Sequence, residues 1–137
     1  IAYILGVLVT LFKFRRKKIT IKIDGKLYSR ELILLAAGNG RYYGGGMKIL
    51  PDAQLNDGYL HLCLVSNAHN LTLLTLFPTI FKGSHVRLKK YVEVFKAKSI
   101  SLIGQENLDL NFDGEIINNG NEVKFELAHE KLKVIYE

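Results

Sequence analysis

Apolar and polar residues alternate with a period of two through much of the chain, which predicts β-strands that bury one face. The alternation starts over residues 19–23, and Asp24-Gly25 predicts a tight turn into a second strand over residues 27–37. The second part of that strand, residues 32–37, is continuously apolar, as in strands buried on both faces. A third strand is expected over residues 59–65.

The period of two returns after Tyr91 and continues toward the end of the chain. Turn signals interrupt it at Asp113-Gly114, Asn119-Gly120 and His129-Glu130. The apolar positions of these runs are Val92, Val94, Ile100, Leu102, Leu108, Leu110, Phe112, Val123, Phe125 and Leu127. Short strands at this spacing predict a mainly β domain, either an antiparallel sandwich or an open barrel.

One internal segment, residues 67–83, has the helical period instead. Its apolar residues, at spacings of three and four, are Leu73, Leu76, Phe77, Ile80 and Phe81. Asn67 or Asn70 could cap the start of this helix, and Gly83 suits its end. Pro78 is expected to kink the helix or to begin a second short one.

Residues 1–14 are expected to form a leading amphipathic helix. Its apolar face consists of Ile1, Ile4, Leu5, Leu8 and Phe12. About 12 apolar residues are too few to span a bilayer, which needs roughly 20. The chain begins at Ile1 without an initiator methionine, so we expect a fragment from which the beginning of this helix was removed.

Composition then limits the class of protein. A chain of 137 residues with 48% apolar residues is long enough for one domain with a sizeable core, and this composition excludes a disordered chain. Cys63 is the single cysteine, which excludes an internal disulfide and fits a cytosolic protein. The sequence has no cysteine and histidine cluster of the zinc-binding type.

The net charge of +6 favours an anionic partner, namely a membrane surface, a nucleotide phosphate or a nucleic acid. The charge is concentrated in two runs, which consist of Lys13, Arg15, Arg16, Lys17 and Lys18 and of Lys82, His85, Arg87, Lys89 and Lys90. Each run is either a solvated face or an attachment to anionic lipid. Too few aromatic residues lie among the basic ones to form a stacking platform, so no nucleic-acid partner is expected.

The first candidate for chemistry is the glycine-rich stretch of residues 38–46. Glycines let backbone N–H groups approach an anion, and Arg41 could reach a phosphate. The spacing does not match a P-loop, and no helix is expected after it. The alternative is a loop in which two stretches of backbone pass close together.

Two further segments carry acids next to glycine. Residues 51–59 contain two acids and two amides, which could hold Mg²⁺ or simply form an Asn/Asp-Gly turn. In Asp113-Gly114-Glu115, the glutamate follows a tight turn and precedes apolar residues, so it is either a general base or a solvated acid. The histidines at positions 61, 69, 85 and 129 lie far apart and form no triad with Cys63 or a serine.

Taken together, the order and spacing of these segments resemble bacterial diacylglycerol kinases and the wider group that includes sphingosine and ceramide kinases. The resemblance is carried by residues 38–49, by Pro51-Asp52-Ala53, by Asn56-Asp57-Gly58 and by the late Asp113-Gly114-Glu115. It extends over nearly the whole chain. It is specific for the family and does not indicate which lipid is the acceptor.

The resemblance implies a fold and a domain organisation. Enzymes of this family have an α/β N-terminal domain that binds ATP with a Gly-Gly-Asp-Gly-Thr loop, and that loop is absent from this sequence. Residues 1–137 would therefore be the second domain, an antiparallel β-sandwich of two sheets with one or two helices. NAD kinases share this architecture.

The resemblance also assigns roles to residues. Glu115 would accept the proton of the lipid hydroxyl. Asp57 would bind a structural Mg²⁺ through its carboxylate, together with the backbone carbonyls of Gln54 and Tyr59. A second Mg²⁺ would accompany ATP, the co-substrate, and would be held mainly by the missing N-terminal domain.

The expected function is therefore that of a lipid kinase domain. The intact enzyme would transfer the γ-phosphoryl group of ATP to diacylglycerol or a similar lipid and give phosphatidate, a step of phospholipid biosynthesis. It would be cytoplasmic and bound peripherally to the inner face of the membrane, and a sheet edge could pair two chains into a homodimer. The alternative is a non-catalytic β module that binds lipid or membrane.

Overall fold

The computed structural model describes residues 15–118 and 120–128. The expected leading helix over residues 1–14 and His129 lie outside these ranges, as does Asn119 of the Asn119-Gly120 turn.

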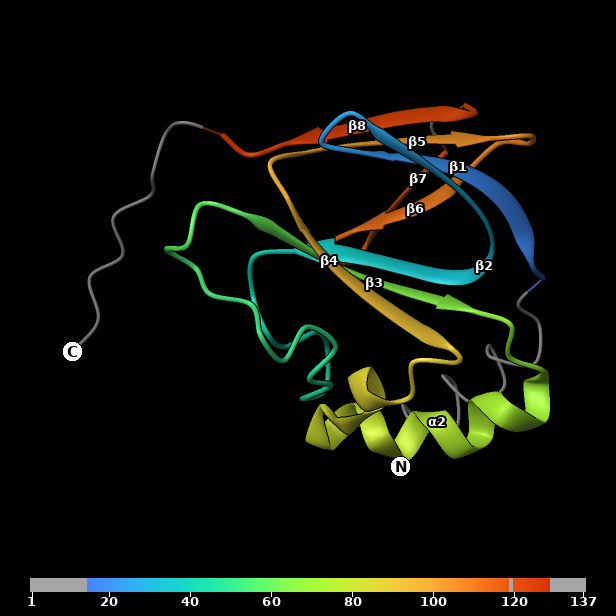
Figure 1. Ribbon diagram of the computed structural model, residues 1–137, viewed down its shortest axis with the longest axis vertical. Coiled ribbons are helices and arrows are strands. Elements are labelled where there is room, and N and C mark those ends of the chain that lie inside the picture. The colour runs from blue at the N-terminus through green and yellow to red at the C-terminus, as the bar shows by residue number, and fades with distance from the viewer. Residues whose placement is uncertain (1–14, 119, 129–137) are drawn as a thin grey trace.

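The described chain is mainly β, with two antiparallel sheets and one α-helix (Figure 1). The larger sheet has six strands in the order β4-β3-β2-β1-β5-β8, and the smaller is the two-stranded ribbon β6-β7. The strands are β1 (Lys17–Ile23), β2 (Lys26–Gly38), β3 (Leu60–Ser66), β4 (Val92–Ala97), β5 (Ser99–Gly104), β6 (Asp109–Phe112), β7 (Glu115–Asn118) and β8 (Glu122–Glu126). This arrangement confirms the predicted mainly β, two-sheet sandwich.

The predicted hairpin between the first two strands is confirmed. Asp24 and Gly25 have φ values of 45° and 88°, so both occupy the left-handed region that a two-residue hairpin turn requires. The carboxylate of Asp24 also accepts hydrogen bonds from the backbone N–H groups of Lys98 and Ser99, each at 2.9 Å. The turn therefore also stabilises the connection from β4 to β5.

Strand β2 explains why residues 32–37 are continuously apolar. A β-bulge interrupts its pairing with β3 between Leu32 and Leu34, and this extra residue changes which positions face each side. Leu32, Leu35 and Ala37 belong to one core, whereas Ile33 and Ala36 pack on the opposite face. The prediction of a strand buried on both faces is thus confirmed, with a change of register that the sequence pattern did not reveal.

The main core lies on one face of the six-stranded sheet, where strands β1, β3 and β5 supply most of its fully buried side chains. Leu108 and Leu110, before and within the ribbon, pack against this core, and the rings of Phe112 and Phe125 lie 5.5 Å apart. The ribbon therefore closes the sandwich at the β8 side of the sheet.

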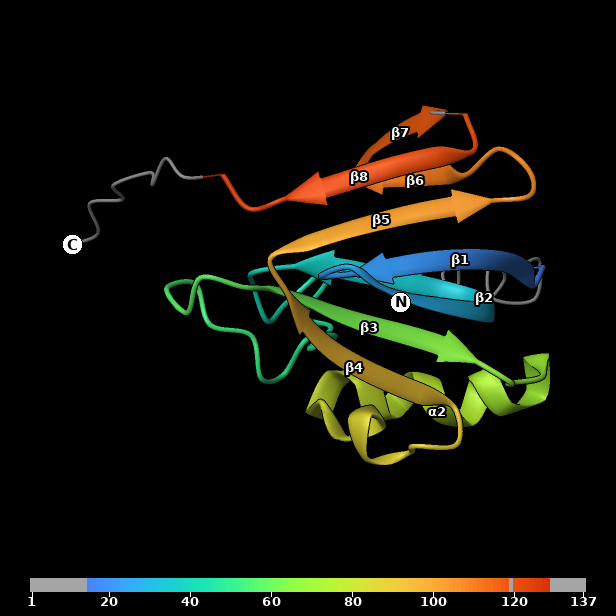
Figure 2. The ribbon, with the colours of Figure 1, turned by 45° about the horizontal axis from the view of Figure 1, so that its top comes forward.

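The opposite face of the sheet is covered by the long loop between β2 and β3 and by the helix. Leu50 and Ala53 of the loop pack on Cys63 and Val92, and Leu73 and Leu76 of the helix form a neighbouring cluster. Cys63 is buried in this core, and burial raises the pKa of its thiol to about 12. Figure 2 shows the helix beside β3 and β4 at one edge of the sheet and the ribbon beside β8 at the other.

The predicted internal helix is α2 (Asn70–Lys82), followed by the short 3₁₀ helix η1 (Ser84–Arg87). Its end at Gly83 is confirmed by the left-handed φ of 72°. The predicted caps were wrong, because the N-cap residue is His69 and its side chain makes no capping hydrogen bond. The helix runs continuously through Pro78, so a second helix does not begin there, and the exposed proline ring faces solvent.

Candidate functional site

The glycine-rich stretch forms a small hairpin. Tyr43 and Met47 pair through two backbone hydrogen bonds of 2.8 and 3.0 Å, and the turn between them contains Gly45 and Gly46 with φ values of 58° and 85°. At its base, the Tyr43 hydroxyl donates to the carbonyl of Ala37 at 2.8 Å. A Cβ at Gly38 would collide with that hydroxyl, so the close passage of two backbone stretches explains the glycine there.

The rest of this loop is held in place by backbone acceptors. Arg41 donates from Nε to the carbonyl of Ala53 at 2.8 Å, and His85 donates from Nε2 to the carbonyl of Ile49 at 2.9 Å. The sequence left open that Arg41 could reach a phosphate, and at least one of its donors serves the loop itself. Burial lowers the pKa of His85, although the hydrogen bond to the carbonyl of Ile49 opposes this effect, so its imidazole is a neutral structural group.

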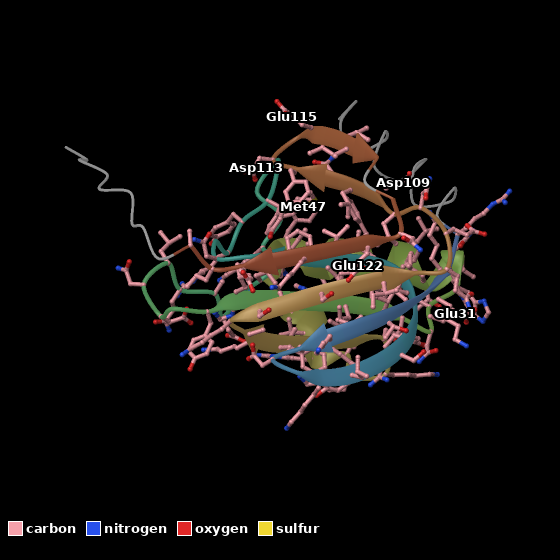
Figure 3. The ribbon with its side chains drawn as sticks, turned by 90° about the horizontal axis from the view of Figure 1, so that it is seen from above. Glu31, Met47, Asp109, Asp113, Glu115 and Glu122 are labelled. Atoms are coloured by element: carbon pink, nitrogen blue, oxygen red, sulfur yellow. The ribbon has the colours of Figure 1, made fainter. Side chains whose placement is uncertain are left out.

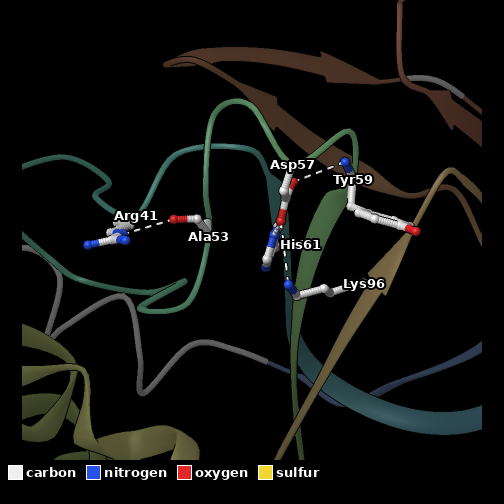
Figure 4. A network of polar contacts seen from close by, with 6 residues as sticks. All are labelled: Arg41, Ala53, Asp57, Tyr59, His61 and Lys96. Atoms are coloured by element: carbon white, nitrogen blue, oxygen red, sulfur yellow. Dashed lines mark hydrogen bonds and ion pairs between the residues drawn. The ribbon is translucent and has the colours of Figure 1, made fainter.

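Asp57 is the centre of the polar network at the start of β3 (Figure 4). Its Oδ1 accepts from the backbone N–H of Tyr59 at 3.1 Å, and its Oδ2 lies 2.8 Å from His61 Nε2 and 3.4 Å from Lys96 Nζ. The side chain is 14% exposed. The hydrogen bond from His61 is the main cause of the lowered pKa of Asp57, and the Tyr59 N–H and Lys96 add to it, so the carboxylate is ionised at neutral pH.

The predicted metal ligands lie in one turn around this carboxylate. The backbone N–H of Asp57 makes a long contact of 3.5 Å with the carbonyl oxygen of Gln54. A carbonyl oxygen has two lone pairs, so this oxygen can also bind a cation. A carboxylate and two backbone carbonyls are hard oxygen donors of the kind that Mg²⁺ takes, with waters completing the octahedron. No cluster of three or more His, Cys, Asp or Glu occurs in the described residues, so a cation here would depend on a single carboxylate. These oxygen atoms are therefore chemically suited to bind Mg²⁺. The ammonium group of Lys96 also lies beside the Asp57 carboxylate, at 3.4 Å.

Asp113 and Gly114 form the turn of the β6-β7 ribbon. Their φ values of 48° and 102° match a two-residue hairpin turn, and the N–H of Gly114 donates to the side-chain amide oxygen of Asn111 at 2.9 Å. Glu115 is the first residue of β7 and pairs with Phe112 across the ribbon. Its side chain is exposed, and Figure 3 shows it at the outer rim of the molecule.

The structure brings the ribbon turn near the glycine-rich hairpin, although the two segments lie about 70 residues apart along the chain. Burial raises the pKa of Tyr43, and the carboxylate of Asp113 raises it further, which requires the two side chains to be close. Figure 3 likewise shows Asp113 on the side of the molecule where Met47 lies. No hydrogen bond or ion pair within the described residues joins Glu115 to Asp57.

Sequence reasoning missed two members of the Asp57 network, His61 and Lys96. His61 lies four residues after Asp57, a spacing that could have drawn attention to it. Lys96 is the cross-strand partner of His61 in the pairing of β3 with β4. That contact depends on strand register, which the local pattern of residues does not specify.

The comparison with known families is consistent with this fold. Residues 1–136 match the family described as "YegS C-terminal NAD kinase beta sandwich-like domain". The chain belongs to this family. The resemblance that the sequence motifs indicated is thereby confirmed, as is the assignment to a C-terminal β-sandwich domain.

Relatives in this family include named kinases. The chain is 37% identical over 99 residues to a diacylglycerol kinase of Mycobacterium tuberculosis. The aligned region covers 72% of the chain and 32% of that protein. It is 29% identical over 115 residues to a diacylglycerol kinase of Bacillus subtilis, covering 84% of the chain and 38% of that protein. The YegS family chain thus spans about a third of the length of these relatives.

Solved structures support the fold. The crystal structure of a diacylglycerol kinase from Bacillus anthracis matches with a TM-score of 0.62 at 19% identity, over 88% of the chain and 44% of that structure. Another structure from the same organism matches with a TM-score of 0.67 at 24% identity. Among the described residues, no helix has the length and apolar character needed to cross a bilayer.

Proposed function

We propose that this YegS family domain is the acceptor-side half of a lipid kinase. The intact protein would transfer the γ-phosphoryl group of ATP to the hydroxyl of diacylglycerol or a similar lipid, giving phosphatidate and ADP. The observation that carries the proposal is the match of residues 1–136 to this domain family, together with relatives named diacylglycerol kinase. ATP would be bound by an N-terminal domain that these residues do not contain.

Glu115 would act as the general base. Its carboxylate takes the proton of the lipid hydroxyl while the hydroxyl oxygen attacks the γ-phosphorus and the bond from that phosphorus to the bridging oxygen of ADP breaks. Such assistance is worth roughly 10²–10⁴ in rate. The role suits a residue at the start of β7, because the backbone of a paired strand fixes the position of its side chain.

The surroundings of Glu115 support a site that another surface completes. Phe112, Ile116 and Ile117 are exposed apolar side chains on the same ribbon, and Ile116 is 76% exposed. Apolar groups of this size around an acid are expected where a lipid chain or a second domain covers them. Covering the carboxylate in this way would exclude water from the reacting atoms.

Mg²⁺ would be held by Asp57 and by the carbonyls of Gln54 and Tyr59, as the donor set described above allows. A bound Mg²⁺ would supply a fixed positive charge that orders the turn before β3. His61 and Lys96 position the Asp57 carboxylate in the described structure. The Mg²⁺ that accompanies ATP would belong to the N-terminal domain.

The test of the base is a matched pair of substitutions in the intact protein. Glu115→Gln should lower the rate of lipid phosphorylation by 10²–10⁴ while leaving ATP binding near normal. Glu122→Gln makes the same change at another exposed position at the start of a strand and should leave the rate within a factor of a few. If Glu115→Gln retained that much activity, the assigned role would be wrong.

A second function is a non-catalytic module that binds lipid or membrane, favoured by the basic surface and by the exposed position of Glu115. It would not need Glu115. A complete protein that lacks an ATP-binding loop and binds vesicles equally well after Glu115→Gln would favour this alternative. In either case, we propose a peripheral protein on the cytoplasmic side of a membrane.

A further inference from the structure

We propose that helix α2 and the turn after η1 form the surface that docks this protein on an anionic phospholipid bilayer. This inference deepens the proposed membrane partner by naming the surface, and it does not depend on the chemistry at Glu115. It rests on three observations. The exposed side of α2 carries apolar residues, basic residues lie at both ends of that helix, and the β6-β7 ribbon on the opposite side of the sheet carries acids.

The outward side of α2 carries apolar residues that the sheet does not cover. Leu73, Leu76 and Phe77 turn inward. The opposite side of the helix exposes Leu71, Thr75 and Pro78 at helical spacing, and Leu71 is 74% exposed. Phe81 and, just beyond η1, Leu88 add exposures of 37% and 40%. A helix with one buried and one exposed apolar side has the character of an interfacial helix.

Basic residues surround this stripe. Lys82 ends the helix, and Arg87, Lys89 and Lys90 follow on the exposed turn. At the other end of the helix, Arg16 donates to the carbonyl of Ala68 at 3.1 Å, just before α2 begins. Arg16 of the first basic run thus lies at the start of α2, whereas Lys82, Arg87, Lys89 and Lys90 of the second run lie at its end and beyond it, more than 60 residues away along the chain.

The segment of chain that carries α2 and the turn after η1 contains no acid of its own. The sequence contains no Asp or Glu from Gly58 to Val92. Within the described residues, the ion pairs formed by lysine and arginine involve Lys17, Arg30, Lys96 and Lys124, and none involves a residue of this surface. His85 was part of the second basic run but is buried and neutral, so it does not contribute.

The exposed apolar surface on the β6-β7 ribbon has the opposite charge. It carries three exposed acids, Asp109, Asp113 and Glu115. Asp109 is paired with Lys17 at 3.3 Å, and an anionic bilayer would repel the carboxylates of Asp113 and Glu115. The ribbon packs on one face of the six-stranded sheet and α2 on the opposite face, and Figure 2 shows them on opposite sides of the molecule. The sign of the charge therefore selects the α2 side as the one that faces anionic lipid, since exposed Leu and Phe can enter the headgroup region while basic residues attract the lipid phosphates.

The experiment measures binding of the intact protein to vesicles of phosphatidylcholine with and without phosphatidylglycerol. The wild type should bind the anionic vesicles, and salt should weaken binding. Arg87→Gln with Lys89→Gln should reduce partitioning on the order of 25-fold, about fivefold for each charge removed. Lys22→Gln with Lys26→Gln removes the same charge from the β1-β2 hairpin and should have a much smaller effect.

An apolar pair of variants tests the other half of the surface. Leu71→Ser should weaken binding, whereas Leu27→Ser, at a residue of similar exposure (68%) on the hairpin, should not. If the hairpin variants lost as much binding as the α2 variants, or if neither α2 variant weakened it, the proposed surface would be wrong.

Kinase activity on diacylglycerol dispersed in detergent separates this inference from the proposed function. The α2 variants should keep that activity, because micelles need no docking to a bilayer, and should lose activity on vesicles. Absence of activity in the wild type would contradict the kinase function and leave the vesicle result to stand on its own. Loss of detergent activity in the α2 variants, with folding intact, would contradict a surface that serves docking alone.

Discussion

Asp57 makes both a local contact within its own turn and a contact to Lys96, which is distant in the sequence. The sequence Asn56-Asp57-Gly58 predicts a turn, within which the Asp57 side chain accepts the N–H of Tyr59, and the role of Asp57 as an oxygen ligand is a prediction from the family resemblance. The contact to His61 joins residues four apart in the chain, whereas the contact to Lys96 arises only once β3 and β4 pair in register. The turn around Asp57 was therefore predictable from the sequence, whereas the position of Lys96 beside its carboxylate was not.

Magnesium binding can be tested residue by residue around this acid. Mg²⁺ at about ten times its dissociation constant should stabilise the intact protein by about 1.4 kcal/mol, a shift of a few degrees in Tm. Asp57→Ala should abolish the shift measured by thermal unfolding. Gln54→Ala should preserve it, because Gln54 would contribute only its backbone carbonyl.

Asp52 provides the control, since it is an exposed acid of the same loop outside the network. Asp52→Ala should leave the Mg²⁺-dependent shift unchanged. A shift that survives Asp57→Ala would place the cation elsewhere.

At the scale of elements, local signals predicted what local geometry controls. The Asp-Gly turns at residues 24 and 113 were predicted because both positions of the turn need positive φ, and both hairpins formed. Strand β7 was missed, since its four residues begin next to the turn and adjacent Ile116 and Ile117 hide the period of two. The bulge in β2 was also missed, because a continuous apolar run reads the same with or without a change of register.

The continuous helix α2 leads to a prediction about Pro78. Proline has no N–H to donate to the carbonyl one turn earlier, and its ring crowds that turn. Because the side chain is exposed, Pro78→Ala should stabilise the protein, by up to about 3 kcal/mol in denaturant unfolding. Thr75→Ala, at an exposed position of the same helix, should change stability by less than about 1 kcal/mol. Destabilisation by Pro78→Ala would mean that the proline ring makes packing contacts that the helix needs.

At the scale of the whole molecule, one buried imidazole links stability to pH. Burial lowers the pKa of His85 in the folded state, so the unfolded chain binds more protons once the pH falls below about 6.5. Its contribution to stability is therefore complete above that pH and is lost as the pH falls toward the folded pKa. The free energy of unfolding, measured by denaturant titration, should decrease between pH 7 and pH 5.

Substitution separates His85 from the other histidines. His85→Gln should lower stability at pH 7, because it disturbs the contact with Ile49, and should flatten the dependence between pH 7 and pH 5. His69→Gln changes an exposed histidine and should leave the slope as it is in the wild type. An unchanged slope in His85→Gln would assign the acid sensitivity to another group.

The placement of α2 and the β6-β7 ribbon on opposite sides of the sheet has a consequence for the substrate. If the helix rests on the leaflet and the ribbon carries the reacting carboxylate, a diacylglycerol molecule cannot react while both of its tails stay among their neighbours. It has to be lifted out, with its chains sheltered by protein on the way. Turnover would then depend on how easily each lipid leaves its leaflet, so shorter or less saturated chains would react faster even though the hydroxyl is the same.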